Sequence, residues 1–152
     1  IMFICNHCPF VIHVNKTLVN IANSYTQKGI NFIAISSNDS INYPQDAPHK
    51  MKIHAIENAY PFPYLYDETQ AIAKAYDAAC TPDLYVFDAE LKLIYRGQLD
   101  DSRPGNNELI DGRDIKLAIR QIIEDGPPIL DTKPATGCNI KWKTGNEPSY
   151  FG

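Results

Sequence analysis

The order of apolar patterns along the chain predicts an α/β fold in which a mixed central sheet is flanked by helices. A continuously apolar run at 1–4, an amphipathic segment and a second apolar run at 32–36 indicate two parallel strands joined by a right-handed helical crossover. Two β-rich runs, 84–87 and 91–95, surround Asp88-Ala89-Glu90 and indicate an antiparallel hairpin. A sheet with both kinds of pairing is mixed, and helices are expected on both of its faces.

The chain of 152 residues carries a formal net charge of −4, which bounds its class. This length favours a single domain with a proper hydrophobic core. Because Lys and Arg are outnumbered by Asp and Glu and do not cluster, nucleic acid is not an expected partner. No apolar stretch approaches the roughly 20 residues of a membrane span. Four cysteines are too few for a disulfide scaffold, so pairwise or catalytic use is expected.

The first helix is expected to begin at Pro9 and to end near Lys28-Gly29. Proline is tolerated in the first turn of a helix, and it biases the preceding residue, Cys8, away from helical angles. A cation followed by glycine is typical of a helix C-terminus. The apolar side chains that fall on one side at helical spacing are Phe10, Val14, Leu18, Ile21, Ala22 and Tyr25.

The middle of the chain is expected to hold two further helices and a short extended segment. A weakly patterned helix covers about 47–58, and an extended segment covers 61–66. An Ala-rich helix follows over 69–76, capped by Asp67 or Thr69. These elements lie between the first crossover and the hairpin, so they form an insertion between the two halves of the sheet.

The last part of the chain begins with the clearest helical face in the sequence and then loses its periodicity. Apolar residues at i, i+3, i+4, i+7 and i+8 are Ile115, Ala118, Ile119, Ile122 and Ile123. Gly126 and Pro127 end this helix. We therefore expect residues 1–126 to form the domain and residues 127–152 to form an irregular tail packed on it.

The most informative motif is the C-x-x-C of Cys5-Asn6-His7-Cys8-Pro9, which lies between the first strand and the first helix. A helix N-terminus has unpaired N–H groups and the positive end of the helix dipole, so it favours a thiolate there. The second thiol of the motif can close a mixed disulfide formed on the first within the same turn. A structural disulfide or two inert buried thiols are the alternatives that the motif leaves open.

Five short motifs make the chain similar to the thioredoxin-like redoxins of the alkyl hydroperoxide reductase/thiol-specific antioxidant clan. They are Cys5-Asn6-His7-Cys8-Pro9-Phe10-Val11, Ser37-Asn38-Asp39, Cys80-Thr81-Pro82-Asp83, Tyr95-Arg96-Gly97 and Gly137-Cys138-Asn139-Ile140-Lys141-Trp142-Lys143. The resemblance spans nearly the whole chain and implies a thioredoxin-like fold with an inserted strand–helix unit, as in peroxiredoxins. It also implies a segment before Ile1, so the compartment, cytoplasmic or periplasmic, stays open.

This resemblance implies a thiol–disulfide oxidoreductase that needs no cofactor. Cys5 would be the attacking thiol at the exposed end, and Cys8 the resolving thiol one turn deeper. The expected partners are protein or small-molecule disulfides and a reducing thiol. His7 directly before the second cysteine resembles the oxidising members of the superfamily, because a partly protonated imidazole favours the reduced form. We therefore expect a reduction potential above the roughly −270 mV of thioredoxin, unless His7 merely faces solvent.

The resemblance also places Thr81-Pro82 opposite the C-x-x-C, with a cis peptide bond whose exposed backbone pairs with an extended substrate. A trans, structural proline is the alternative. Cys80 is then a candidate third redox thiol, although a core filler is an equal interpretation. Cys138 belongs to the tail motif, and a structural role is favoured over a resolving one.

Two other functions compete with disulfide exchange. Peroxiredoxins carry Thr three residues before the peroxidatic Cys and an Arg that polarises the peroxide, whereas Met2 precedes Cys5 by three and Pro82 stands about where that Arg would lie. A peroxiredoxin-like thiol peroxidase is therefore the first alternative.

The second alternative is a copper or zinc binding protein. The cysteine pair together with one of His7, Cys80 or His13 offers soft ligands. Neighbouring side chains at a helix start diverge, which disfavours adjacent His7 and Cys8 as ligands of one metal, and we assign no metal ligand.

Overall fold

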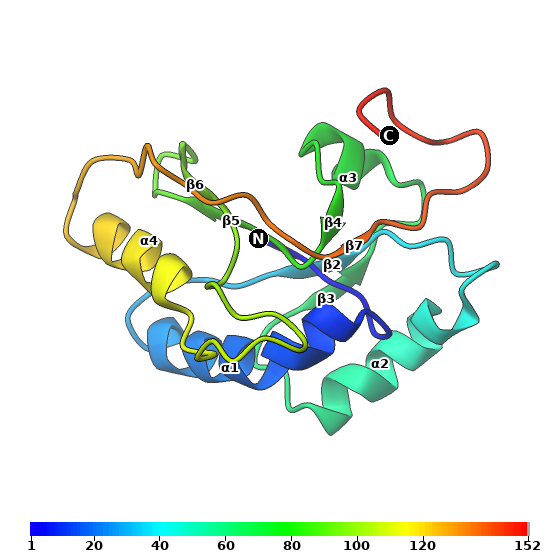
Figure 1. The fold of residues 1–152 in the computed structure, drawn as a ribbon, viewed down its shortest axis with the longest axis horizontal. Helices are drawn as coiled ribbons and strands as arrows, with labels where there is room; N and C mark the ends of the chain where they lie inside the picture. The colour runs from blue at the N-terminus through cyan, green and yellow to red at the C-terminus, as the bar shows by residue number, and fades with distance from the viewer. Residues whose placement is uncertain (152) are drawn as a thin grey trace.

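The computed structural model describes residues 1–151 and is built on a five-stranded sheet in the order β3-β2-β1-β5-β6 (Figure 1). The strands are β1 (Met2–Phe3), β2 (Ala34–Ser36), β3 (Tyr64–Tyr66), β5 (Asp83–Phe87) and β6 (Leu93–Gly97). Strands β1, β2 and β3 pair in parallel, whereas β5 pairs antiparallel with both β1 and β6. The predicted mixed sheet is therefore confirmed.

The helices are α1 (Pro9–Thr26), α2 (Pro48–Glu57), α3 (Ala71–Ala75) and α4 (Arg113–Ile123), with a short 3₁₀ turn, η1 (Pro44–Asp46). Each α-helix lies within three residues of its expected boundaries. Figure 1 shows α1 and α4 together on one side of the sheet, and α3 with the end of the tail on the other. Among residues 1–151, no helix is both long and apolar enough to cross a lipid bilayer.

The two faces of the sheet have separate cores because successive strand residues point to opposite sides. On one face, Met2 and Leu84 pack with the apolar stripes of α1 and α4. On the other face, Phe3 and Tyr85 pack with the α3 region and with Trp142 of the tail. Trp142 of the tail therefore completes the second core.

The hairpin differs slightly from its prediction. Its second strand was expected at residues 91–95 but covers Leu93–Gly97. Leu91 has a φ of 61° and belongs to the turn, and the register is irregular at Val86/Phe87. The β-propensity of the apolar residues alone favoured a strand start at Leu91. In the structure Leu91 has a positive φ, which is costly for a residue with a side chain and does not occur in a strand, so β6 begins only at Leu93.

The tail is less irregular than its composition predicted. Residues Cys138–Asn139 form a strand, β7, that pairs antiparallel with β4 (Cys80–Thr81). In Figure 1 the orange tail runs beside the green β4 segment before it turns toward α3. Two residues are too short for an alternating pattern, so periodicity could not have predicted this pairing. The domain boundary at residue 126 itself stays a prediction.

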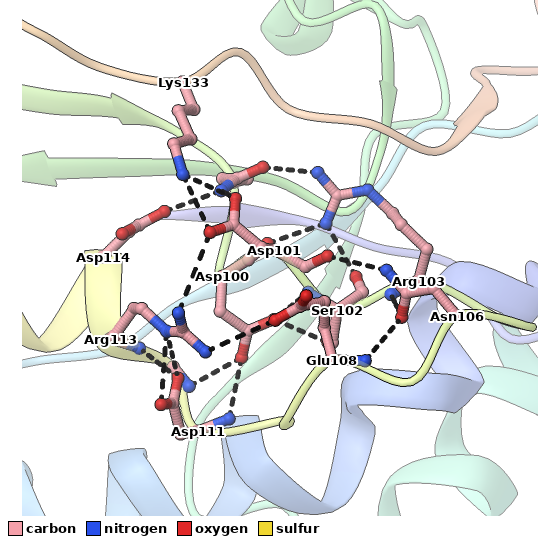
Figure 2. A network of polar contacts seen from close by, with 12 residues as sticks. Asp100, Asp101, Ser102, Arg103, Asn106, Glu108, Asp111, Arg113, Asp114 and Lys133 are labelled. Atoms are coloured by element: carbon pink, nitrogen blue, oxygen red, sulfur yellow. Dashed lines mark hydrogen bonds and ion pairs between the residues drawn. The ribbon is translucent and has the colours of Figure 1, made fainter.

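A polar network fixes the loop between β6 and α4 (Figure 2). At its centre the carboxylate of Asp100, which is buried, accepts hydrogen bonds from the backbone N–H groups of Ser102 at 2.9 Å, Asp111 at 2.9 Å and Gly112 at 2.7 Å. On its rim Lys133 donates to Asp101 at 2.7 Å, which ties the start of the tail to the same loop. One buried carboxylate thus replaces the regular backbone bonds that the loop lacks.

Replacing Asp100 should therefore unfold the protein more easily than replacing its neighbour. Asp100→Ala leaves three buried or half-buried N–H groups without an acceptor, and we expect a loss of about 3 kcal/mol in the free energy of unfolding. Asp101→Ala removes the partly exposed ion pairs with Lys133 and Arg113 and one hydrogen bond from Gln98, leaves no backbone N–H group without an acceptor, and serves as the matched control with a smaller loss. Urea denaturation in the presence of reductant measures both, and equal losses would contradict the central role of Asp100.

Candidate active site around Cys5 and Cys8

The two cysteines of the motif lie where β1 ends and α1 begins. Cys8 is the N-cap of α1, with extended angles (φ −67°, ψ 122°), and Pro9 opens the first turn. This is the geometry expected from the restriction that a proline places on the residue before it. Both thiols are free. The expectation that Cys5 lies at an exposed end is wrong, because Cys5 is 1% exposed and Cys8 is 0% exposed.

Thr81 lies against both sulfurs. Its hydroxyl Oγ1 is 3.5 Å from Cys5 Sγ, and its carbonyl oxygen is 3.1 Å from Cys8 Sγ, whose thiol donates to it. The Thr81–Pro82 peptide bond is cis, and both residues are buried. The segment that sequence similarity placed opposite the C-x-x-C is therefore in contact with it.

The backbone of Thr81 is not free for a substrate strand in this structure. β4 pairs with β7 in the register Thr81↔Cys138, and Ile140 N–H donates to the Ala79 carbonyl at 3.0 Å. The chain's own tail thus occupies the edge that an extended substrate was expected to use. Substrate binding by Thr81 and Pro82 stays a prediction, and it would require the tail strand to be displaced.

The two thiols of the pair have opposite protonation tendencies. The pKa of Cys8 is lowered to about 4, mainly by a hydrogen bond from the Cys5 side chain. Hydrogen bonds from the side chains of Cys138 and Thr81 and from the Val11 backbone also lower this pKa, whereas burial raises it. The pKa of Cys5 is raised by the same hydrogen bond, by burial and by the negative charge of Asp46. The Thr81 carbonyl favours a protonated Cys8, but several donors outweigh this one acceptor. These effects favour a thiolate at Cys8 over a thiolate at Cys5.

Asp46 is a site residue that sequence reasoning missed. It comes from η1 and is 0% exposed. Its carboxylate accepts hydrogen bonds from the Asn6 backbone N–H at 2.8 Å, from Asn38 Nδ2 at 2.8 Å and from His7, whose Nδ1 is 2.6 Å away. His7 also stacks on Tyr43, with ring centroids 5.8 Å apart. No sequence signal indicated that the 44–48 segment folds back over the motif.

The same three side chains could hold a cation. Ligand atoms of Cys5, His7 and Asp46 lie within 4.8 Å of one another. The metal hypothesis expected both cysteines with a third ligand, whereas this set keeps Cys5 and His7 and has a carboxylate from η1 in place of Cys8. A thiolate, an imidazole and a carboxylate are ligands that zinc accepts.

The remaining two cysteines flank Thr81 in different ways. Successive residues of a strand point to opposite faces, whereas directly paired residues share a face. Thr81 faces Cys5 and Cys8, the candidate active pair. Its cross-strand partner Cys138 therefore shares that face, and Cys80 points the other way. Cys80 Sγ lies 3.9 Å from the Pro82 carbonyl, and burial raises its pKa to about 12. Cys138 packs against the core cluster that contains Cys5 and Cys8. The structure therefore brings Cys138, not Cys80, onto the pair.

Arg96 lies outside this cluster. Its guanidinium is 3.2 Å from Asp83 and donates to the Asp77 carbonyl at 2.6 Å. It also lies over the Tyr85 ring, 5.0 Å from the ring centroid. These contacts give Arg96 a structural role as the ion-pair partner of Asp83.

Comparisons with known proteins agree with the fold. The Redoxin family model matches residues 1–111. The chain belongs to the Redoxin family. A search of curated proteins gave no match. The family and the thioredoxin-like fold together support a thiol oxidoreductase or peroxidase kind of function.

Three solved structures resemble this redoxin. An uncharacterized conserved protein from Geobacillus kaustophilus is 59% identical, with a TM-score of 0.91, covering 93% of this chain and 75% of that one. A hypothetical protein from Sinorhizobium meliloti 1021 is 40% identical, with a TM-score of 0.93, covering 95% and 79%. A thioredoxin-like protein solved in its oxidized form is 19% identical, with a TM-score of 0.63, covering 82% and 78%, and it shows the fold alone.

The buried charge of Asp46 should hold back the reactivity of Cys5. Asp46→Asn removes a negative charge that raises the Cys5 pKa, so the pKa of Cys5 should fall and its alkylation by iodoacetamide should become faster at neutral pH. Peptide mass spectrometry would follow the rate at Cys5 across a pH series. Asp39→Asn, at another buried acid of the same insertion, is the matched control and should leave the rate unchanged. A slower rate in Asp46→Asn would show that positioning of the loop outweighs the charge.

Proposed function

We propose that this redoxin is a thiol–disulfide oxidoreductase that works through Cys5 and Cys8. The observation that carries the proposal is the contact of both sulfurs with Thr81 beside the cis-proline, at the N-terminus of α1. Two inert core cysteines would not need a mutual hydrogen bond or a lowered pKa on one of them. The buried pair is therefore best explained as a redox dithiol in its reduced form.

The proposed reaction is two successive exchanges. Cys5 passes its proton to Cys8 and attacks one sulfur of a substrate disulfide, so that a Cys5–substrate bond forms and the other substrate sulfur leaves as a thiolate that takes up a proton. Cys8 gives up its proton and attacks the Cys5 sulfur as a thiolate, the Cys5–substrate bond breaks, and the second substrate sulfur leaves as a thiolate that takes up that proton. The substrate gains two electrons, and the protein is left with a Cys5–Cys8 disulfide.

Peroxide reduction is less well supported. The Thr81 hydroxyl contacts Cys5, and the negative charge of Asp46 raises the pKa of Cys5 and so disfavours a thiolate there. Arg96 is held by Asp83 and Asp77, away from the sulfur. A polarising cation at the sulfur is what an efficient peroxidase needs. Peroxide consumption well above the rate of a free thiol would reverse this ranking.

Metal binding is the second candidate, because Cys5, His7 and Asp46 lie together. The imidazole Nδ1 and the carboxylate Oδ2 are 2.6 Å apart and hydrogen-bonded to each other. A single zinc ion, with bonds of about 2.0–2.3 Å in tetrahedral geometry, holds its ligands farther apart than this. Binding would therefore break the His7–Asp46 hydrogen bond. Stoichiometric metal in untagged protein would favour this candidate over disulfide exchange.

A covalent trap tests which sulfur attacks. Cys8→Ser keeps the proposed attacking thiol but removes the resolving one, so mixed disulfides with disulfide-bonded insulin or with disulfide-bonded lysate proteins should accumulate, and catalytic insulin reduction should fall by at least about 100-fold. Cys5→Ser is the matched variant and should capture no substrate. Non-reducing electrophoresis and peptide mapping measure both. Capture by Cys5→Ser instead would assign the attack to Cys8, whose thiolate is the more stable of the two.

The role of His7 is tested by the reduction potential. We propose that the imidazole favours the reduced pair, so the wild-type potential should lie above the roughly −270 mV of thioredoxin. His7→Ala should lower it by on the order of 30 mV, which is a roughly tenfold change in the equilibrium constant. His49→Ala, on the exposed surface of α2, is the control and should leave it unchanged. Equilibration with glutathione buffers gives the values, and a wild-type potential at or below that of thioredoxin contradicts the proposal.

A further inference from the structure

The tail strand is fitted closely to the cis-proline segment. A Cβ atom at Gly137 would lie 1.9 Å from the Thr81 carbonyl oxygen, so only glycine allows the two backbones to approach this far. Directly after Gly137, Cys138 takes the position opposite Thr81. The tail therefore presents a cysteine to the active pair in the way that an extended substrate strand would present its own sulfur.

The tail is also held on both sides of Cys138. Before it, the Lys133 carbonyl accepts from Gln98 N–H at 3.2 Å, and Lys133 Nζ binds Asp101 (Figure 2). After it, Lys141 N–H donates to Asn38 Oδ1 at 2.9 Å, and the Lys141 carbonyl accepts from Asp39 N–H at 2.7 Å. These anchors fix the position of Cys138 beside the pair even though few regular strand bonds surround it.

The three thiols that share this face differ in their access to solvent. Cys5 and Cys8 are no more than 1% exposed, whereas Cys138 is half-buried. Cys138 packs against the core cluster that contains Cys5 and Cys8, and a hydrogen bond between the Cys138 and Cys8 side chains contributes to the lowered pKa of Cys8. This arrangement links the interior pair to the surface.

We propose that Cys138 is a third redox thiol that replaces Cys5 as the disulfide partner of Cys8, an inference that rests on the proposed disulfide exchange. In the step, the Cys138 thiolate attacks the Cys8 sulfur of the Cys5–Cys8 disulfide. The Cys8–Cys138 bond forms, the Cys5–Cys8 bond breaks, and Cys5 leaves as a thiolate that takes up the proton lost by Cys138. No electrons are gained or lost, because one disulfide replaces another.

Recycling then occurs at the accessible sulfur. A reducing dithiol attacks Cys138, and Cys8 leaves as a thiolate. The second thiol of the reductant then displaces Cys138, so that the reductant becomes a disulfide and all three cysteines become thiols.

Cross-linking of Cys5→Ser tests the inference directly. After oxidation with diamide, acid quench and alkylation of free thiols, peptide mass spectrometry should find Cys8 linked to Cys138. The double variant Cys5→Ser/Cys138→Ser should lack the link, and Cys5→Ser/Cys80→Ser should retain it, since Cys80 points to the other face. Three free thiols in Cys5→Ser, or a Cys8–Cys80 link, would overturn the inference.

The wild-type protein provides a second measurement that needs no buried substitution. Oxidised to one disulfide per chain, it should contain both Cys5–Cys8 and Cys8–Cys138 links, and Gly137→Ala should reduce the second by pushing β7 away from Thr81. Re-reduction by dithiothreitol should be about tenfold slower in Cys138→Ser. A single Cys5–Cys8 species with unchanged re-reduction would overturn the inference.

Insulin reduction separates this inference from the proposed function. Wild-type activity on insulin without any Cys8–Cys138 link would overturn the three-thiol relay and leave the oxidoreductase proposal standing. A Cys8–Cys138 link in a protein that does not reduce insulin would support the relay and overturn protein disulfides as the substrate.

Discussion

The contact between Thr81 and the two buried sulfurs is the constraint on which the site depends. It holds the end of β1, the first turn of α1 and the cis-proline segment against one another across a sequence separation of more than 70 residues. The same threonine pairs with Cys138 on its other edge, so the tail is drawn to the same point. Fold, active pair and tail are thus joined through one residue that is itself 2% exposed.

Burial determines how the thiols can react. A charge in the interior is costly unless hydrogen bonds stabilise it, so the donors around Cys8 decide where the thiolate rests, and Asp46 discourages a second negative charge at Cys5. Asp46 is itself satisfied by Asn6, Asn38 and His7. The insertion therefore places the charge of Asp46 near Cys5 and helps to bury the pair. The more exposed thiol that packs against the cluster with Cys5 and Cys8 is Cys138 of the tail.

Much of the fold could be predicted because its signals are local. The apolar run before the C-x-x-C, the helical stripe after Pro9 and the periodic face of α4 each reflect burial of one side of an element. The position of Cys8 at the helix cap followed from Pro9 alone. The exposure of Cys5 was predicted wrongly, because exposure depends on what covers a residue, and Asp46, Thr81 and the tail come from distant parts of the chain.

By itself, the sequence determined the mixed α/β architecture, the order of its elements and the C-x-x-C at a helix N-terminus, because backbone sterics and apolar periodicity act over a few residues. Only the tertiary structure decided that Asp46 folds back onto His7, that β7 occupies the edge of Thr81, and that Cys138 instead of Cys80 faces the active pair. These depend on pairing between segments tens of residues apart, where a two-residue strand and a single glycine leave no pattern to read. The C-x-x-C motif suggested the chemistry that we propose, and the packing around it determined which sulfurs lie together.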